Sequence, residues 1–268
     1  MPRLHASRRY LPEMPFRGLD PFTCRSYLAV SVYLQQDSSF SPSGFTGIEL
    51  AYLMIMPTTS QESRATWSPW GLEYARTPGR YVFGTEPSDF ALDIAWLVEP
   101  GHRVLDLGCG EGRDSVFFAE LGAVVTGIDL SADGLEKARR LAHARGVRVS
   151  WRVGPMLDVL PPGPFHLIFS CGSIHYVPRD RRALLFERLK AMTRSGGHHA
   201  HLVFTDRLVH EEKGEVVDYF EPGELAESFV EWQTVARRNH VISCAQDGTV
   251  HGHAVEELVT ARPGWRAR

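Results

Sequence analysis

From Trp67 onward, apolar positions recur with two periods, one typical of strands and one typical of helices. Short apolar runs or alternating patterns predict strands over 104–107, 123–128, 147–153, 165–170 and 199–205. Helical spacing predicts helices over 87–98, 115–121, 132–144, 179–194 and 222–230. Long strand-like stretches at 232–243 and 250–261 flank the turn Asp247-Gly248. Strands that alternate with helices predict a doubly wound α/β domain over 87–264, with a mostly parallel sheet and an antiparallel hairpin at its end.

Residues 1–55 lack this regularity, because Pro, Ser and aromatic residues are mixed there without a sustained period. Met54 and Met56 come just before the regular pattern starts. We expect 1–55 to be a poorly ordered extension, or a stretch that is absent from a native protein starting at Met56.

Residues 56–86 form a separate entry segment that is rich in aromatic side chains. These are Trp67, Trp70, Tyr74, Tyr81 and Phe83. They could cover the edge of the sheet as packing, or they could close over a ligand and exclude water. We favour a lid, with Tyr81 and Phe83 as its substrate-facing residues.

A glycine-rich loop follows the first strand of the domain and leads into a helix. It reads Asp106-Leu107-Gly108-Cys109-Gly110-Glu111-Gly112-Arg113. Glycines at such a turn allow close approach of backbone to ligand, and the helix N-terminus attracts a negatively charged group. A dinucleotide fingerprint would need a third glycine at position 113, which is Arg113. Asp106 beside the loop would repel a pyrophosphate but would accept from an ammonium group.

Asp129 ends the second strand, where the ribose of an adenosine would present its hydroxyls. Methyl-donor and dinucleotide sites share this acid, so it does not separate them. The spacing and Asp106 favour S-adenosylmethionine. The alternatives are a nicotinamide-dependent oxidoreductase and a non-catalytic module that holds S-adenosylmethionine or S-adenosylhomocysteine.

The segments 104–113 and 127–131 resemble the first two motifs of the class I S-adenosylmethionine-dependent methyltransferases. The resemblance extends over about 81–263, and the ending 219–225 with Trp232 resembles the tellurite-resistance methyltransferase group. It implies a Rossmann-like fold with a seven-stranded, mostly parallel sheet and an antiparallel strand in the C-terminal hairpin. It also implies methyl transfer by in-line displacement.

The same resemblance implies a set of cofactor-binding residues. The methionine end would lie against Asp106, Gly108, Cys109, Gly110, Ser170 and Cys171, and the adenosine against Asp129, Leu130, Met156, Leu157 and Asp158. The tellurite-resistance group also has a His-Arg pair before the turn of the last hairpin, where this chain has Ile242-Ser243. The metalloid acceptor of that group is therefore not carried over to this chain.

Histidines give further candidates. His175 and Tyr176 follow the fourth strand of the domain, where His175 could serve as a general base or could simply pack. His199 with His201, and His251 with His253, should each share one face of a strand. Because no Cys or acid lies beside them at metal-ligand spacing, we expect partly exposed strand residues and no metal.

Composition narrows the function further. A net charge of −3 provides no basic field for nucleic acid, and four scattered cysteines indicate neither a disulfide framework nor a zinc ribbon. The apolar run at 45–57 is shorter than the ~20 residues that cross a bilayer. We therefore expect a cytoplasmic enzyme with a small-molecule acceptor, no nucleic-acid or membrane partner, and an oligomeric state that the sequence leaves open.

Overall fold

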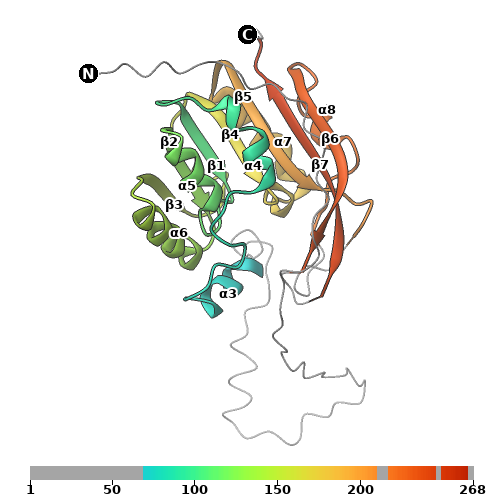
Figure 1. The fold of residues 1–268 in the computed structure, drawn as a ribbon. Coiled ribbons are helices and arrows are strands. Elements are labelled where there is room, and N and C mark those ends of the chain that lie inside the picture. The colour runs from blue at the N-terminus through green and yellow to red at the C-terminus, as the bar shows by residue number, and fades with distance from the viewer. Residues whose placement is uncertain (1–68, 210–216, 246–248, 265–268) are drawn as a thin grey trace, which may run out of the picture. The chain divides into compact units, whose positions relative to one another are not determined.

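A computed structural model describes residues 69–209, 217–245 and 249–264, and it places them in an α/β fold (Figure 1). The predictions for residues 1–55 and for Trp67 lie outside the described residues.

The centre of the fold is a seven-stranded sheet with the order β3-β2-β1-β4-β5-β7-β6. The strands are β1 (Arg103–Leu107), β2 (Val124–Asp129), β3 (Val149–Val153), β4 (Phe165–Cys171), β5 (Thr193–Phe204), β6 (Gln233–Cys244) and β7 (His251–Ala261). Strands β1 to β5 pair in parallel, whereas β7 is antiparallel to both β5 and β6. This confirms the predicted mostly parallel sheet and its antiparallel C-terminal hairpin.

Helices cover both faces of the sheet (Figure 1). They are α3 (Pro69–Arg76), α4 (Asp89–Asp93), α5 (Arg113–Glu120), α6 (Ala132–Ala144), α7 (Arg179–Ala191) and α8 (Glu224–Glu227), with 3-10 turns η1 (Ala95–Leu97) and η2 (Ile174–Tyr176). On one face α4 and α5 pack against β1, β4 and β5 through a core that includes Phe90, Phe118 and Phe169. On the other face α7 and α8 pack through Phe186, Leu189 and Leu225.

Most predicted elements are confirmed, but the helix predicted over 87–98 is divided into the short helix α4 and the 3-10 turn η1, and the helix predicted over 222–230 is reduced to α8. Ser131 caps α6, as expected, because its hydroxyl accepts from the Gly134 N–H at 3.0 Å. The helix predicted from position 87 instead begins after Ser88, whose hydroxyl accepts from Ala91 N–H. Strand β5 starts at Thr193, six positions before the predicted start, because Gly196-Gly197 lies within the strand instead of ending a turn.

The strand order reverses direction between β1 and β4. The chain runs from β1 outward to β2 and β3, and it then returns to place β4 on the opposite side of β1. The loops that leave the carboxyl ends of β1 and β4 therefore separate, and in open α/β sheets ligands bind in the crevice that this creates. Among the described helices, none has the length and apolar character needed to cross a membrane.

Candidate functional site

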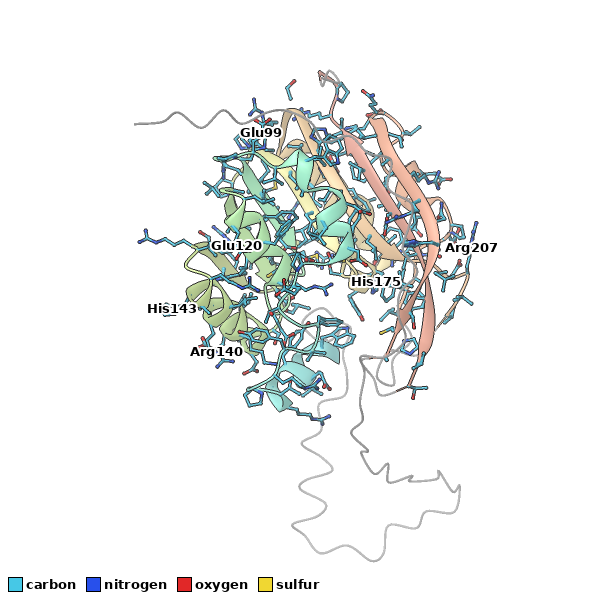
Figure 2. The ribbon with its side chains drawn as sticks, viewed as in Figure 1. Glu99, Glu120, Arg140, His143, His175 and Arg207 are labelled. Carbon is cyan, nitrogen blue, oxygen red and sulfur yellow. The ribbon has the colours of Figure 1, made fainter. Side chains whose placement is uncertain are left out.

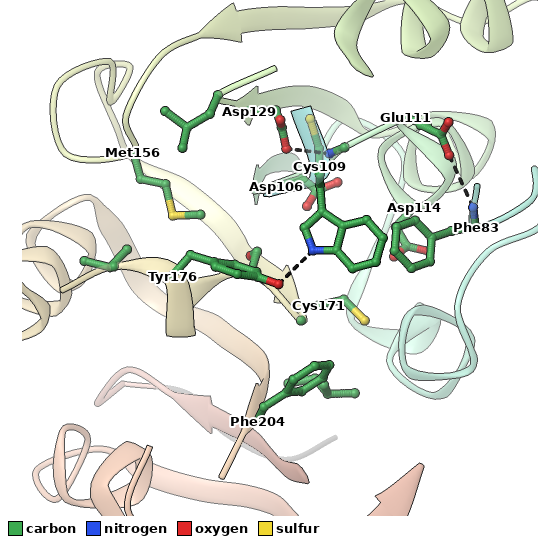
Figure 3. Close-up of a pocket in the computed structure, with 18 of the residues that line it drawn as sticks. Phe83, Asp106, Cys109, Glu111, Asp114, Asp129, Met156, Cys171, Tyr176 and Phe204 are labelled. Atoms are coloured by element: carbon green, nitrogen blue, oxygen red, sulfur yellow. Dashed lines mark hydrogen bonds between the residues drawn. The ribbon is translucent and has the colours of Figure 1, made fainter. Parts of the chain in front are cut away.

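A pocket of about 320 Å³ opens at the carboxyl ends of the parallel strands (Figure 3). Its lining comes from the loops after β1, β2, β3 and β4, from the adjoining ends of β5, β6 and β7, and from α3 and the segment after it. The volume falls within the range of small-ligand sites, about 300–1,000 Å³. The topology thus brings together segments that are far apart in the sequence.

The glycine loop forms the tightest part of the pocket. Gly108 has a φ of +68°, and a Cβ at this position would lie 2.2 Å from the Cβ of Ser173. Gly110 has a φ of +52°, and its Cβ would lie 2.8 Å from the hydroxyl of Tyr74. A side chain at either position would therefore be strained and would collide with its surroundings. Ser173 and Tyr74 thus require glycine at these two positions, and both glycines line the pocket without a side chain.

Asp106 lies at the base of this loop and is 2% exposed. Ser115 Oγ donates to its carboxylate at 2.6 Å. Burial, and then the nearby negative charge of Asp114, raise the pKa of Asp106 to about 8. A cationic group placed against this carboxyl would offset both effects, so the position favours an ammonium or sulfonium centre.

Asp129 ends β2 and helps to fix the glycine loop. Its carboxylate accepts from the backbone N–H groups of Gly110 and Ser131, each at 2.8 Å. Burial raises the pKa of this carboxyl even though these hydrogen bonds favour its charged form. Two carboxylate oxygens offer about four acceptor positions, so the backbone contacts leave acceptor capacity for a hydroxyl of a ligand.

A buried ion pair fastens the entry segment to the domain. Lys137 on α6 donates to Glu111 Oε1 at 2.8 Å, and each side chain is 2% exposed. The same ammonium donates to Thr77 Oγ1 and to the Arg80 carbonyl, both at 2.9 Å. The other oxygen of Glu111 accepts from the backbone N–H of Val82 at 2.7 Å. One residue of the glycine loop thus positions the chain that closes the pocket.

Aromatic side chains cover the pocket beside this anchor (Figure 3). The Trp70 indole N–H donates to the Tyr176 hydroxyl at 2.7 Å, which links α3 to the turn after β4. The Trp70 and Phe83 rings lie 4.9 Å apart. Both residues line the pocket, and the lid that the sequence predicts for the entry segment stays a prediction.

Most of the predicted cofactor residues line the pocket. They are Asp106, Gly108, Cys109, Gly110, Asp129, Leu130, Met156, Leu157, Asp158 and Cys171, and the candidates Tyr176 and Phe83 join them. Cys109 is buried and Cys171 is half-buried, and removal of their thiols from water raises the pKa of each, to about 12 for Cys171. Both are therefore protonated packing residues and not thiolates.

Three predicted residues are absent from the pocket lining, namely Ser170, Tyr81 and His175. Ser170 is fully buried and hydrogen bonded to His201, 2.8 Å away, because its position on β4 faces the core. Tyr81 points away from the pocket: its hydroxyl donates to the Lys137 carbonyl at 3.1 Å, and its ring packs beside Leu141. The structure therefore does not support a cofactor contact for Ser170 or a lid role for Tyr81.

His175, labelled in Figure 2, is buried and is not part of the pocket lining. Its ring stacks on Phe204 at 4.4 Å, and its Nδ1 accepts from the Phe204 N–H at 3.5 Å. Burial lowers its pKa well below the ordinary value. The neighbouring Tyr176, not His175, presents its side chain to the pocket, so the geometry does not support a base at His175.

The histidines of β5 are core residues, which corrects the expectation of partial exposure. His199 and His201 are fully buried, and burial lowers the pKa of both, to about 3 for His201. Their rings form a continuous hydrogen-bonded chain from Ser170 through His201 and His199 to Thr193, with separations of 2.8, 2.9 and 2.8 Å. This chain satisfies the buried polar atoms of the β4–β5 pair.

The sequence indicated Ile242-Ser243 only through the family resemblance, and it predicted no other residue of the wall that the last strands contribute. Phe204, Ile242, Ser243, Cys244 and His253 line the side of the pocket away from the glycine loop. Sequence reasoning also missed Glu111, although an acid inside a glycine-rich loop was a visible signal. No local signal identified the wall, because the pairing of β7 with both β5 and β6 creates it.

Comparison with known proteins agrees with this arrangement. Residues 104–197 match the family model described as a methyltransferase domain. The ubiquinone biosynthesis O-methyltransferase of Bordetella pertussis is 34% identical over 113 residues, which are 40% of this chain and 46% of that protein. The chain thus spans about half the length of this curated relative.

Solved structures show the same fold. TehB from Haemophilus influenzae superposes with a TM-score of 0.57 at 20% identity, over 64% of this chain and 61% of that one. The 1,6-didemethyltoxoflavin-N1-methyltransferase of Burkholderia thailandensis superposes with a TM-score of 0.56 at 22% identity, over 77% and 92%. Residues 104–197 thus resemble a methyltransferase domain, and the described residues share the fold of these solved methyltransferases.

Proposed function

We propose that this protein binds S-adenosylmethionine and transfers its methyl group to a small-molecule acceptor. The observation that carries the proposal is the pairing of a buried acid, Asp106, with a side-chain-free cradle at Gly108 and Gly110. A dinucleotide would instead place a pyrophosphate against this acid. The third dinucleotide glycine is also replaced by Arg113.

The pocket residues fit the cofactor group by group. Asp106 would hold the amino-acid end, where an ammonium compensates the buried carboxyl. Asp129 would take the ribose hydroxyls with the acceptor positions that its backbone contacts leave open. Leu130, Met156 and Leu157 would enclose the adenine, and Asp158 lies at the same side of the lining to meet its amino group.

When bound, the cofactor supplies an activated methyl group on a sulfonium sulfur. The protein itself would position the reacting groups and exclude water from them. Trp70 and Phe83 cover the opening, and the Trp70–Tyr176 hydrogen bond holds this cover against the turn after β4. Exclusion of water strengthens the contacts of the buried acids and keeps the acceptor aligned for in-line attack. In this proposal Tyr176 is a positioning residue that accepts the hydrogen bond of Trp70.

The acceptor would occupy the side of the pocket formed by the last strands. Leu202, Phe204 and Ile242 make that wall largely apolar. A pocket of about 320 Å³ under an aromatic cover suits a small molecule better than a polymer. A net charge of −3 likewise gives nucleic acid no electrostatic attraction.

Calorimetric titration of the full chain with S-adenosylmethionine, S-adenosylhomocysteine and reduced nicotinamide dinucleotide tests the cofactor. We expect binding of the first two, and Asp129→Ala should weaken it by about 1–3 kcal/mol. Binding of the dinucleotide alone would overturn the proposal.

A screen for transfer of labelled methyl groups to thiols, amines, phenols, halides and metalloid oxyanions tests the acceptor. Labelled product from one class with wild type, reduced in Asp129→Ala, is the expected result. Cofactor binding without transfer to any class would indicate a binding module instead of an enzyme.

A further inference from the structure

The β6–β7 hairpin brings three soft donor groups together beside the pocket. Cys244 ends β6 and pairs across the ladder with His251, the first residue of β7. His253 lies two positions further along β7, on the same face as His251. The thiol sulfur of Cys244 and one ring nitrogen from each histidine all lie within 4.8 Å of one another.

The two imidazoles already point at one another. Their Nε2 atoms are 2.8 Å apart, and the rings meet edge to face with centroids 4.6 Å apart. His251 Nδ1 lies 2.8 Å from the Thr249 carbonyl oxygen, which can only accept. In the neutral ring the proton is therefore on Nδ1, and the Nε2 lone pair faces the cluster. A carbonyl behind a histidine is how metal ligands are commonly oriented.

The position of His253 is fixed before any ligand arrives. The residue is 1% exposed, and its ring stacks on Phe204 at 4.2 Å. Cys244 and His253 both line the pocket, on the side away from the glycine loop. The cluster therefore combines a rigid member inside the pocket with two half-buried members at the hairpin end.

We propose that Cys244, His251 and His253 form a three-ligand site for a zinc-class divalent ion at the acceptor side of the pocket. One thiolate and two imidazoles are the donors that Zn²⁺ and its borderline-soft relatives prefer. Three protein ligands leave a fourth tetrahedral position for water or for a donor atom of the acceptor. This site differs from the expectation that these histidines hold no metal.

Small adjustments suffice to form the site. Tetrahedral bond lengths place two zinc-bound nitrogens about 3.3 Å apart and a nitrogen and a sulfur about 3.6 Å apart. The two Nε2 atoms would thus separate by about half an ångström from their 2.8 Å contact. Binding would release the thiol proton of Cys244 and move the single ring proton of His253 from Nε2 to Nδ1, which leaves both imidazoles neutral.

Titration of the tag-free, chelator-treated full chain with Zn²⁺ and with Co²⁺ tests the site without any methyl donor. We expect one equivalent of each ion to bind and the cobalt form to show thiolate-to-metal charge-transfer absorption. Cys244→Ser should abolish that band and weaken binding on the order of 100-fold or more. His251→Ala, at a half-exposed position that can lose its ring without disturbing the core, should weaken binding comparably.

Cys171→Ser is the matched control, because Cys171 also lines the pocket but lies outside the cluster. This variant should keep both the stoichiometry and the band. The absence of stoichiometric binding would overturn the proposal, and so would a band that survives in Cys244→Ser or disappears in Cys171→Ser. Because no cofactor is present, these outcomes are independent of the methyl-transfer proposal.

Discussion

Lys137→Met should detach the entry segment from the domain while leaving most of the packing intact. Methionine retains the apolar stem of lysine but loses the ammonium group. The ammonium contacts Glu111 at 2.8 Å, and Thr77 and the Arg80 carbonyl at 2.9 Å. The substitution therefore removes a cation from a carboxylate whose side chain is only 2% exposed.

The magnitude follows from the burial of that pair. Removing one partner of a buried pair costs about 3–5 kcal/mol, because the remaining charge is left uncompensated. Glu111 still accepts from the N–H groups of Val82 at 2.7 Å and Phe83 at 3.3 Å, which places the loss near the lower end. We expect a loss of about 3 kcal/mol in the free energy of unfolding, or roughly 6–12 °C in the unfolding midpoint.

Urea and thermal unfolding, followed by circular dichroism, measure the loss. Arg139→Met is the matched control, because Arg139 lies on the same helix and pairs with Glu136 at 3.5 Å on the surface, where it is half exposed. That variant should lose no more than about 1 kcal/mol.

The double variant Glu111→Gln with Lys137→Met completes a cycle, and it should lose clearly less than the sum of the single losses. Equal losses for Lys137→Met and Arg139→Met, or additive losses around the cycle, would refute the argument that this pair anchors the cover.

The pKa of Asp106 is about 8, and the ammonium group of bound S-adenosylmethionine would lower it, so binding at neutral pH should release close to one proton. Calorimetry in buffers of different ionisation enthalpy measures this proton release, and Asp106→Asn should abolish the release. Because the pKa of Asp106 is higher in the folded chain, the folded chain binds this proton more tightly than the unfolded chain does. The free energy of unfolding should therefore fall as pH rises from 3.8 to about 8, and it should fall less steeply in Asp106→Asn. Gly108→Ala should lose about 1–3 kcal/mol of stability in urea unfolding together with cofactor binding, whereas Gly79→Ala, with nothing within 4 Å of its Cβ, should lose neither. Tyr176→Phe removes the acceptor of the Trp70 indole and should speed cofactor release about 2- to 10-fold in stopped-flow measurements. Unchanged release with slower turnover would instead make this hydroxyl a proton acceptor.

The periodic part of the fold was readable from the sequence because strand and helix periods are local. The runs that became β1, β2 and β4 are mostly apolar and largely buried, as expected for strands that helices cover on both faces. The first and last residues of the helices and strands were harder to predict from the sequence. Helix α4 begins after Ser88 because Asp114, 26 positions away, accepts from both its N–H and its hydroxyl.

The sequence by itself determined the class of the fold and the glycine-loop half of the site. Asp106 and Asp129 lie at the ends of consecutive parallel strands, and parallel strands bring those ends to one edge of the sheet. The expected ligand contacts of this half of the site come from consecutive elements of one segment, so the sequence alone is enough to predict them.

Only the tertiary structure decided which neighbouring side chain faces the pocket, and which distant groups meet. Tyr176 enters the pocket while His175 is buried, because a 3-10 turn directs successive side chains apart and Phe204 packs on the histidine. Lys137 reaches Glu111 from the adjacent helix, and Cys244 meets His251 only through the register of β6 and β7. Such contacts depend on how separate elements pack, and the period of a single element carries no information about its neighbour's register.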